Sequence, residues 1–161
     1  MPVHPSLCYW PEISTGAALF AEHNHEKSFR DVTYITTEPS DPGLFYKICD
    51  YVDDVLKGTL KAKYTPLQVR RWLLQFATET RTNLEAAQSV AVEGKEFKTT
   101  ELDLLMLADL AEYHASKILA AVALSYYQMT NSTEHLIKAY CNMKMALDSW
   151  TSLANRGDGT Y

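Results

Sequence analysis

Four segments of this chain repeat apolar residues with the spacing of an α-helix, and each lies between residues that favour helix ends. The first is expected from Pro42 to Gly58, with Asp41 as its N-cap. Its apolar face consists of Leu44, Ile48, Tyr51 and Val55. The second opens at Thr65 and Pro66 and ends near Gly94. Its expected inward face is Val69, Trp72, Leu73, Phe76, Ala77, Leu84, Ala87 and Ala91, and its outward face is Arg70, Arg71, Gln75, Glu79, Arg81 and Glu85.

The third segment starts near Thr99 or Thr100, reaches about Met129, and is apolar over most of its circumference. Its narrow polar strip consists of Asp109, Glu112, Tyr113 and Ser116. An apolar arc that broad indicates a central helix with neighbours on several sides. The fourth segment runs from Asn131 to Gly157, and its expected inward face is Leu136, Tyr140, Met143, Leu147, Trp150 and Ala154. Because the linkers are short, the sequence predicts an all-α, antiparallel bundle of about four helices over residues 41–161.

Residues 1–40 differ from the rest and are predicted to form an irregular N-terminal arm. Residues 31–37 are rich in β-branched side chains and are predicted to be extended. A lone strand has no ladder partner in an otherwise helical chain. We therefore expect the arm either to wrap the bundle or to pack on a neighbouring domain.

Length and charge exclude several classes of protein. The chain has 161 residues and 18.2 kDa, which suffices for one domain with a hydrophobic core. Fifteen basic and twenty acidic residues give a net charge of −5, which disfavours binding to nucleic-acid phosphates. The longest apolar run, residues 118–124, falls short of the roughly twenty residues of a membrane span. The three widely spaced cysteines argue against a disulfide framework or a thiolate zinc site.

The arm contains a candidate metal site at His23 and His25, which are flanked by Glu22 and Glu26. In an extended segment both imidazoles would point the same way and could bind one divalent ion. Nothing fixes a third ligand nearby, although His4 and Glu12 are available. A solvated polar loop is the more ordinary interpretation, so a small metal-dependent hydrolase is the lesser alternative and we expect no cofactor.

Tyr9, Trp10 and Glu12 combine aromatic rings with a carboxylate, as carbohydrate sites do. The alternative is that Trp10 fills an apolar groove of the bundle, because tryptophan is usually largely buried. His114 could act as a general base, but a single histidine at the margin of an apolar face is more typical of a structural residue. Cys141 has no histidine at a helical step, which gives little support to a thiolate nucleophile.

The order of the motifs along the chain carries a resemblance to a known group of proteins. These motifs lie at residues 9–13 (Tyr-Trp-Pro-Glu-Ile), 41–46 (Asp-Pro-Gly-Leu-Phe-Tyr), 51–56 (Tyr-Val-Asp-Asp-Val-Leu), 64–69 (Tyr-Thr-Pro-Leu-Gln-Val), 72–73 (Trp-Leu), 114–121 (His-Ala-Ser-Lys-Ile-Leu-Ala-Ala) and 146–150 (Ala-Leu-Asp-Ser-Trp). Together they resemble the helical domain that follows the catalytic barrel in large bacterial glycoside-hydrolase-like proteins of the α-glucuronidase or hexosaminidase-like kind. The resemblance covers nearly the whole chain and consists mostly of helix caps and packing residues.

The resemblance implies a non-catalytic accessory domain that packs on or supports a catalytic domain, whose catalytic carboxylates lie on a barrel absent from this chain. It also implies that Tyr9, Trp10 and Glu12 face the substrate cleft of the parent protein, which would be periplasmic or secreted. A second possibility is a partner-binding hairpin between Ala121 and Leu147 that loosely resembles a tetratricopeptide repeat. That hairpin lacks the glycine expected in the first helix of the repeat, and the chain lacks a second copy of it.

Overall fold

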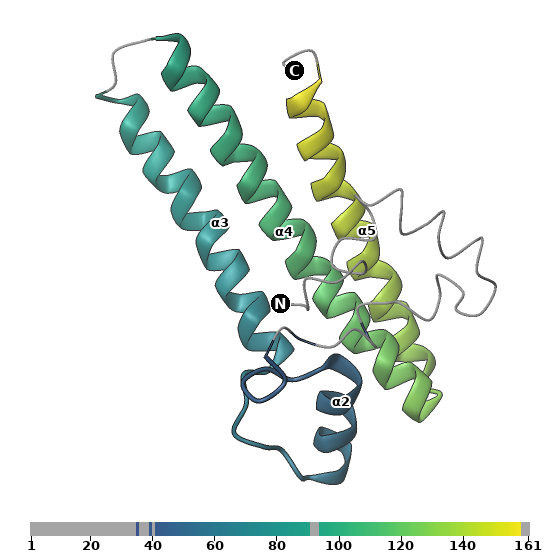
Figure 1. The fold of residues 1–161 in the computed structure, drawn as a ribbon. Coiled ribbons are helices and arrows are strands. Elements are labelled where there is room, and N and C mark those ends of the chain that lie inside the picture. Colours follow the sequence, from purple (N-terminus) through teal and green to yellow (C-terminus); the bar gives the residue numbers. More distant parts are fainter. Residues whose placement is uncertain (1–34, 36–38, 40, 91–93, 159–161) are drawn as a thin grey trace, which may run out of the picture. The chain divides into compact units, whose positions relative to one another are not determined.

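The computed structural model describes residues 35, 39, 41–90 and 94–158 of the chain. These residues form four helices, which are α2 (Ile48–Lys57), α3 (Pro66–Gln88), α4 (Lys95–Thr130) and α5 (Thr133–Gly157) (Figure 1). The described residues contain no β-strand, only isolated bridge positions at Pro39 and between Phe45 and Tyr64. The prediction of an all-α bundle of about four helices is therefore confirmed.

By their internal contacts the residues form two compact units, and each of the long helices α4 and α5 contributes to both. Unit 1 comprises Met1–Pro66 and Ala121–Ala139, and unit 2 comprises Leu67–Ala120 and Tyr140–Tyr161. The expected boundary between an arm and a bundle at residue 40 stays a prediction.

Helix α2 of unit 1, which was expected to start at Pro42, begins six residues later, at Ile48. Asp41 does act as a cap, but of a turn: its Oδ1 accepts hydrogen bonds from the backbone N–H groups of Gly43 (2.9 Å) and Leu44 (3.1 Å). The chain then pairs with Tyr64, whose N–H donates to the carbonyl of Leu44 over 2.8 Å. This pairing takes the backbone out of the helical path and leaves Leu44 exposed, contrary to the prediction. Gly58 ends α2 as expected, with a φ of 70°.

The core of unit 1 combines α2 with the hairpin formed by the end of α4 and the start of α5. Ile48 and Val52 of α2 are fully buried, and Val122 in the hairpin is 4% exposed. Two residues connect the hairpin helices, and Asn131 there adopts a φ of 56°, which asparagine tolerates better than most residues. The helix after this turn begins at Thr133 rather than at Asn131.

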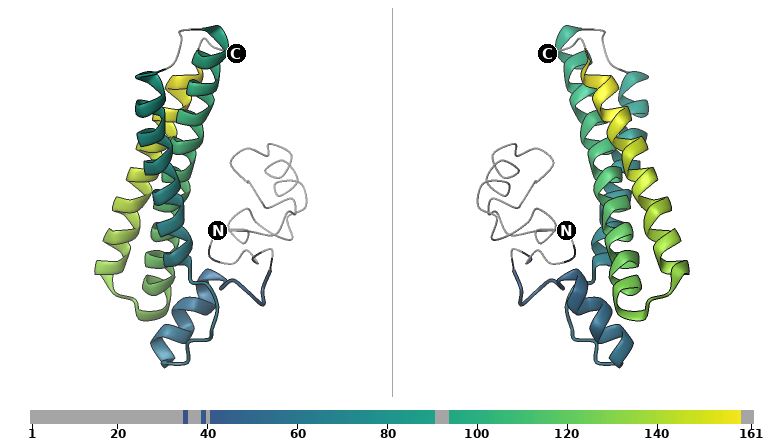
Figure 2. Two further views of the ribbon diagram at one scale, coloured as in Figure 1. Left: turned by 90° about the vertical axis from the view of Figure 1, so that its left-hand side faces the viewer. Right: turned by 90° about the vertical axis from the view of Figure 1, so that its right-hand side faces the viewer.

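Unit 2 contains parts of α3, α4 and α5, which lie side by side in all views (Figure 1, Figure 2). Of the apolar residues of α4, Ala108, Ala115 and Ile118 are buried as predicted, whereas Leu107 is 58% exposed. On α3 the predicted residues Val69, Ala77 and Leu84 are buried as well. The helix also begins at Pro66, as its sequence predicts.

Phe76 and Arg81 on α3 differ most clearly from the prediction. Phe76, expected inside, is 57% exposed, and Arg81, expected outside, turns toward α4. The reason for the second difference is a buried carboxylate, Asp109, which Arg81 reaches from α3. The charge on Arg81 suggested a solvated position, but a charged group is also stable inside a protein when an opposite charge pairs with it.

Of the six α5 residues that were expected to point inward, Trp150 is half-buried and packs on Tyr113, but the other five are exposed. Tyr140 is 71% exposed, Leu147 is 61% exposed, and Leu136, Met143 and Ala154 are also exposed. The buried positions on α5 are small, Ala139 and Ala146. The orientation of α5 about its own axis places Ala146 inward. The same orientation directs Ser152 and Arg156 toward Asp109 of α4. The polar contacts and close packing by alanine thus determine which side of the helix faces inward.

Candidate functional site

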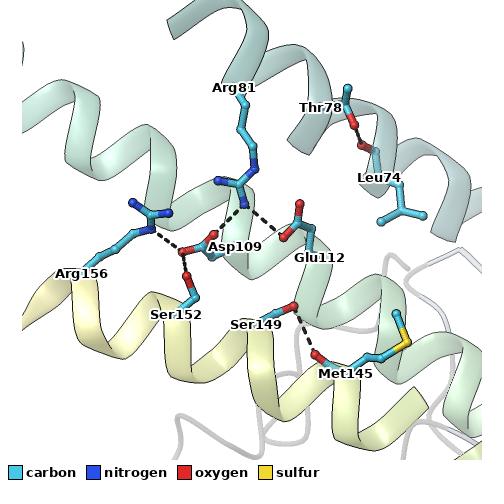
Figure 3. Close-up of polar contacts among 9 residues, drawn as sticks. All are labelled: Leu74, Thr78, Arg81, Asp109, Glu112, Met145, Ser149, Ser152 and Arg156. Carbon is cyan, nitrogen blue, oxygen red and sulfur yellow. Dashed lines mark hydrogen bonds and ion pairs between the residues drawn. The ribbon is translucent and has the colours of Figure 1, made fainter. Parts of the chain in front are cut away.

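A connected group of polar side chains surrounds Asp109 in unit 2 (Figure 3). Nη2 of Arg81 lies 2.6 Å from Oδ1 of Asp109 and 3.0 Å from Oε2 of Glu112. The other oxygen of Asp109 accepts from Nε of Arg156 over 2.7 Å and from Oγ of Ser152 over 3.0 Å. One carboxylate on α4 thus receives hydrogen bonds from α3 and from α5.

The charges in this group balance, with two guanidinium groups against two carboxylates. Asp109 is only 2% exposed, and burial by itself would raise the pKa of its carboxyl. The hydrogen bonds from Arg81, Arg156 and Ser152 outweigh this effect and hold the pKa of Asp109 below its usual value. Asp109 is therefore ionised and fully engaged at neutral pH, which suits a structural connection between helices better than acid–base chemistry.

One turn further along α4, Tyr113 contacts three neighbouring side chains. Its ring centroid lies 5.0 Å from that of Trp150 on α5 and 4.8 Å from that of His114. Nζ of Lys117 donates a hydrogen bond to the hydroxyl of Tyr113 over 3.0 Å and lies 5.0 Å from the ring centroid. The contact with Trp150 makes Tyr113 a second packing connection between α4 and α5.

Burial changes the proton affinity of all three titratable groups here. It lowers the pKa of His114 to about 3, lowers the pKa of Lys117 to about 8 and raises the pKa of Tyr113 to about 12. His114 is accordingly neutral at pH 7 and only 6% exposed. This environment agrees with the interpretation of His114 as a structural residue.

The third candidate is the solvent-facing side of α5 in unit 2, which we call the α5 outer face. It consists of Tyr140, Met143, Lys144, Leu147, Asp148, Thr151 and Ala154, all exposed and spaced so that they share one side of the helix. Its three large apolar side chains, Tyr140, Met143 and Leu147, are 71%, 48% and 61% exposed. Scattered apolar residues are common on protein surfaces, and a row of them at helical spacing makes this side of α5 a candidate interaction surface.

The candidate residues that the sequence placed in the arm lie outside the described residues. They are His4, Tyr9, Trp10, Glu12, His23 and His25. Within residues 41–90 and 94–158, no group of three or more histidine, cysteine, aspartate or glutamate side chains is arranged to hold a metal ion. The metal-binding and carbohydrate-binding roles that the sequence suggested for residues of the arm therefore stay predictions.

Sequence reasoning missed the group around Asp109 and the exposure of the α5 outer face. Asp109 and Glu112 were recognised as a polar strip, and Arg81 as an outward residue, but the pairing between helices depends on their packing. A usable signal was present on α5, where Ser152 and Arg156 lie one turn apart and form a polar line on the side opposite Tyr140.

None of the helices in the described part of the chain is both long enough and apolar enough to span a membrane. Comparison of the chain with protein-family models, with curated proteins and with solved structures found no match.

Proposed function

We propose that this chain is a non-catalytic accessory helical domain of a bacterial carbohydrate-active, glycoside-hydrolase-like protein, and that it binds a protein surface through the α5 outer face. The observation that carries the binding role is the exposure of Tyr140, Met143 and Leu147 along one side of α5. Aromatic residues and methionine are enriched in protein interfaces, where they contribute large contact areas. The proposal that the parent protein is carbohydrate-active rests on the order of motifs along the sequence.

The internal contacts of unit 2 support this role because they hold the binding side of α5 in place. Arg156 and Ser152 connect α5 to Asp109, and Trp150 packs on Tyr113. A surface on a helix held at several positions keeps its shape before the partner arrives. Binding then requires less ordering of the chain, which favours affinity.

A second candidate, a partner-binding hairpin of the tetratricopeptide-like kind, is favoured by the two-residue connection between α4 and α5 in unit 1. There Tyr126 stacks on His135, with ring centroids 5.0 Å apart, across the hairpin. Both candidates bind protein, but the hairpin candidate requires no catalytic domain in the same assembly.

The accessory role is tested by purifying the protein from its native cells with an antibody against this chain. We expect a catalytic domain that hydrolyses glycosides, in the same polypeptide or in the same complex, while the 18.2 kDa chain alone turns over no aryl glycoside. Hydrolysis by the chain alone, or a native form without any such domain, would contradict the proposal. A native partner that is not an enzyme would favour the hairpin candidate.

The role proposed for the arm has a separate test in the intact native protein. If Tyr9, Trp10 and Glu12 face the substrate cleft, the substitution Trp10→Ala should lower affinity for the sugar, because an aromatic ring contributes stacking contacts. Unchanged sugar affinity in a stably folded variant would rule out this role and leave the packing interpretation of Trp10.

A further inference from the structure

We infer that the partner bound by the α5 outer face is a second copy of this chain, in an antiparallel pair related by a twofold axis. The inference rests on the proposed protein-binding role of that face and adds the identity of its partner. The accessory domain would then join two copies of its parent protein. Two independent properties of the face support a self-complementary contact: the placement of its charges and the distribution of its large and small side chains.

The charges on the α5 outer face are Lys144 and Asp148, four positions apart and both exposed. Among the described residues, neither side chain has a hydrogen-bond or ion-pair partner. Elsewhere on the same helix, Lys138 and Glu134 do form an ion pair, with 2.6 Å between Nζ and Oε1. Lysine followed by an acid at this spacing is the less favourable order within a helix, which leaves both groups available to a partner.

A twofold axis makes these two charges complementary. In an antiparallel pair centred at the level of residue 146, Lys144 of each copy lies beside Asp148 of the other, so the same ion pair forms twice. A parallel pair in register would instead place Lys144 next to Lys144. The charges therefore select the antiparallel arrangement, as charged positions do in coiled coils.

Side-chain size leads to the same arrangement. The first half of the face carries the large residues Tyr140 and Met143, while the second half carries the small residues Thr151 and Ala154. In the antiparallel pair, Tyr140 lies at nearly the same level as Thr151 of the second copy. Large side chains thus meet small ones at both ends of the contact, which allows the helices to pack closely without voids.

The association is tested by sedimentation equilibrium of the full chain, with reductant present because Cys141 is exposed on the same helix. A single helical face is smaller than the roughly 800 Å² per partner of a standard interface, so we expect a dissociation constant on the order of 10 μM. At about 200 μM, well above this constant, the main species should have twice the 18.2 kDa mass of one chain.

Leu147→Glu should shift this species to one chain, because it buries a charge at the centre of the contact. Leu107→Glu is the matched control, since Leu107 is 58% exposed but lies on α4. A single-chain mass for the unsubstituted protein at every concentration, or equal dissociation by both variants, would overturn the inference. Circular dichroism of each variant separates loss of association from loss of folding.

Charge reversal tests the orientation of the pair. Lys144→Glu and Asp148→Lys should each weaken self-association about tenfold, because both ion pairs become like-charge contacts. An equimolar mixture of the two variants should associate at least as tightly as the unsubstituted chain, since each supplies the charge that the other lacks. A mixture that stays dissociated would overturn the antiparallel pair.

The outcomes of these tests separate the inference from the proposed function. If the chain does not self-associate but the native purification yields a catalytic domain, the second-copy inference fails and the accessory role stands. If neither association is found, both fail.

Discussion

Nη2 of Arg81 lies 2.6 Å from Oδ1 of Asp109, although 28 positions separate the two residues in the sequence. Arg156, a further 47 positions along the chain from Asp109, reaches the other oxygen of the same carboxylate. One buried side chain of α4 therefore bonds to both neighbouring helices in unit 2.

Asp109→Asn should destabilise the protein by about 3 kcal/mol, because it leaves two partly buried guanidinium groups without their shared negative charge. The free energy of unfolding in urea measures this loss. Glu85→Gln removes a negative charge from an exposed position on α3 and should change stability by less than about 0.5 kcal/mol. Equal effects of the two variants would show that net charge, rather than the contacts of Asp109, determines stability.

The stability of the protein should fall as the pH drops below 6.5, and His114 should account for part of this slope. Burial holds the pKa of His114 at about 3, well below the ordinary value of 6.5. Between these two pH values the unfolded chain binds a proton that the folded chain does not, and acid therefore favours unfolding. His114 lowers the free energy of unfolding by at most about 1.4 kcal/mol for each pH unit of acidification in this range.

His114→Gln removes the titrating group and should flatten this dependence. Urea unfolding between about pH 7.5 and about pH 5 measures it, because most carboxyl groups stay ionised in that range. If the variant and the unsubstituted protein lose stability in parallel with falling pH, the folded protein does not keep His114 neutral.

Ser125→Ala should stabilise the protein by about 1 kcal/mol. The hydroxyl of Ser125 is buried in unit 1 without a hydrogen-bond partner among the described residues. Folding therefore removes this hydroxyl from water without replacing its hydrogen bonds, and the substitution removes that cost. Ser152→Ala is the same substitution at a hydroxyl that donates to Asp109, and it should destabilise by about 1 kcal/mol. Thermal unfolding of both variants should therefore show shifts of opposite sign; shifts of the same sign would contradict this account.

Gly58→Ala should destabilise the protein by about 1 kcal/mol, because Gly58 ends α2 with a φ of 70°. No atom lies within 4 Å of an added Cβ, so the cost comes from the backbone conformation alone. Gly58→Asn should cost less, since asparagine tolerates this conformation better. Urea unfolding distinguishes the two; a larger loss for asparagine would indicate a steric cause.

The sequence predicted helix ends correctly where a capping residue and the helical spacing of apolar residues indicated the same position. Pro66 begins α3 because proline fixes φ near its helical value, and Gly58 ends α2 because glycine readily adopts a left-handed conformation. The start of the first helix was wrong because Asp41 caps a turn as readily as a helix. Pairing of the backbone with Tyr64 decided between the two, and that contact lies twenty residues away.

The inward side of α5 could not be predicted from its apolar period. Tyr140 and Leu147 fit a buried stripe, yet the helix turns Ala146 inward and brings Ser152 to Asp109. Hydrophobic spacing identifies a helix and its apolar side but does not say whether this chain or another molecule covers it. The candidate surface became visible only when the contacts of α5 were known.

The carboxylate of Asp109 also has an evolutionary consequence. A descendant that loses Asp109 gains nothing from keeping Arg81 and Arg156 half-buried, and one that loses either arginine leaves a charge out of balance. Selection should therefore act on the three positions as one trait. Homologous chains are expected to retain the trio intact or to replace all of it with apolar residues.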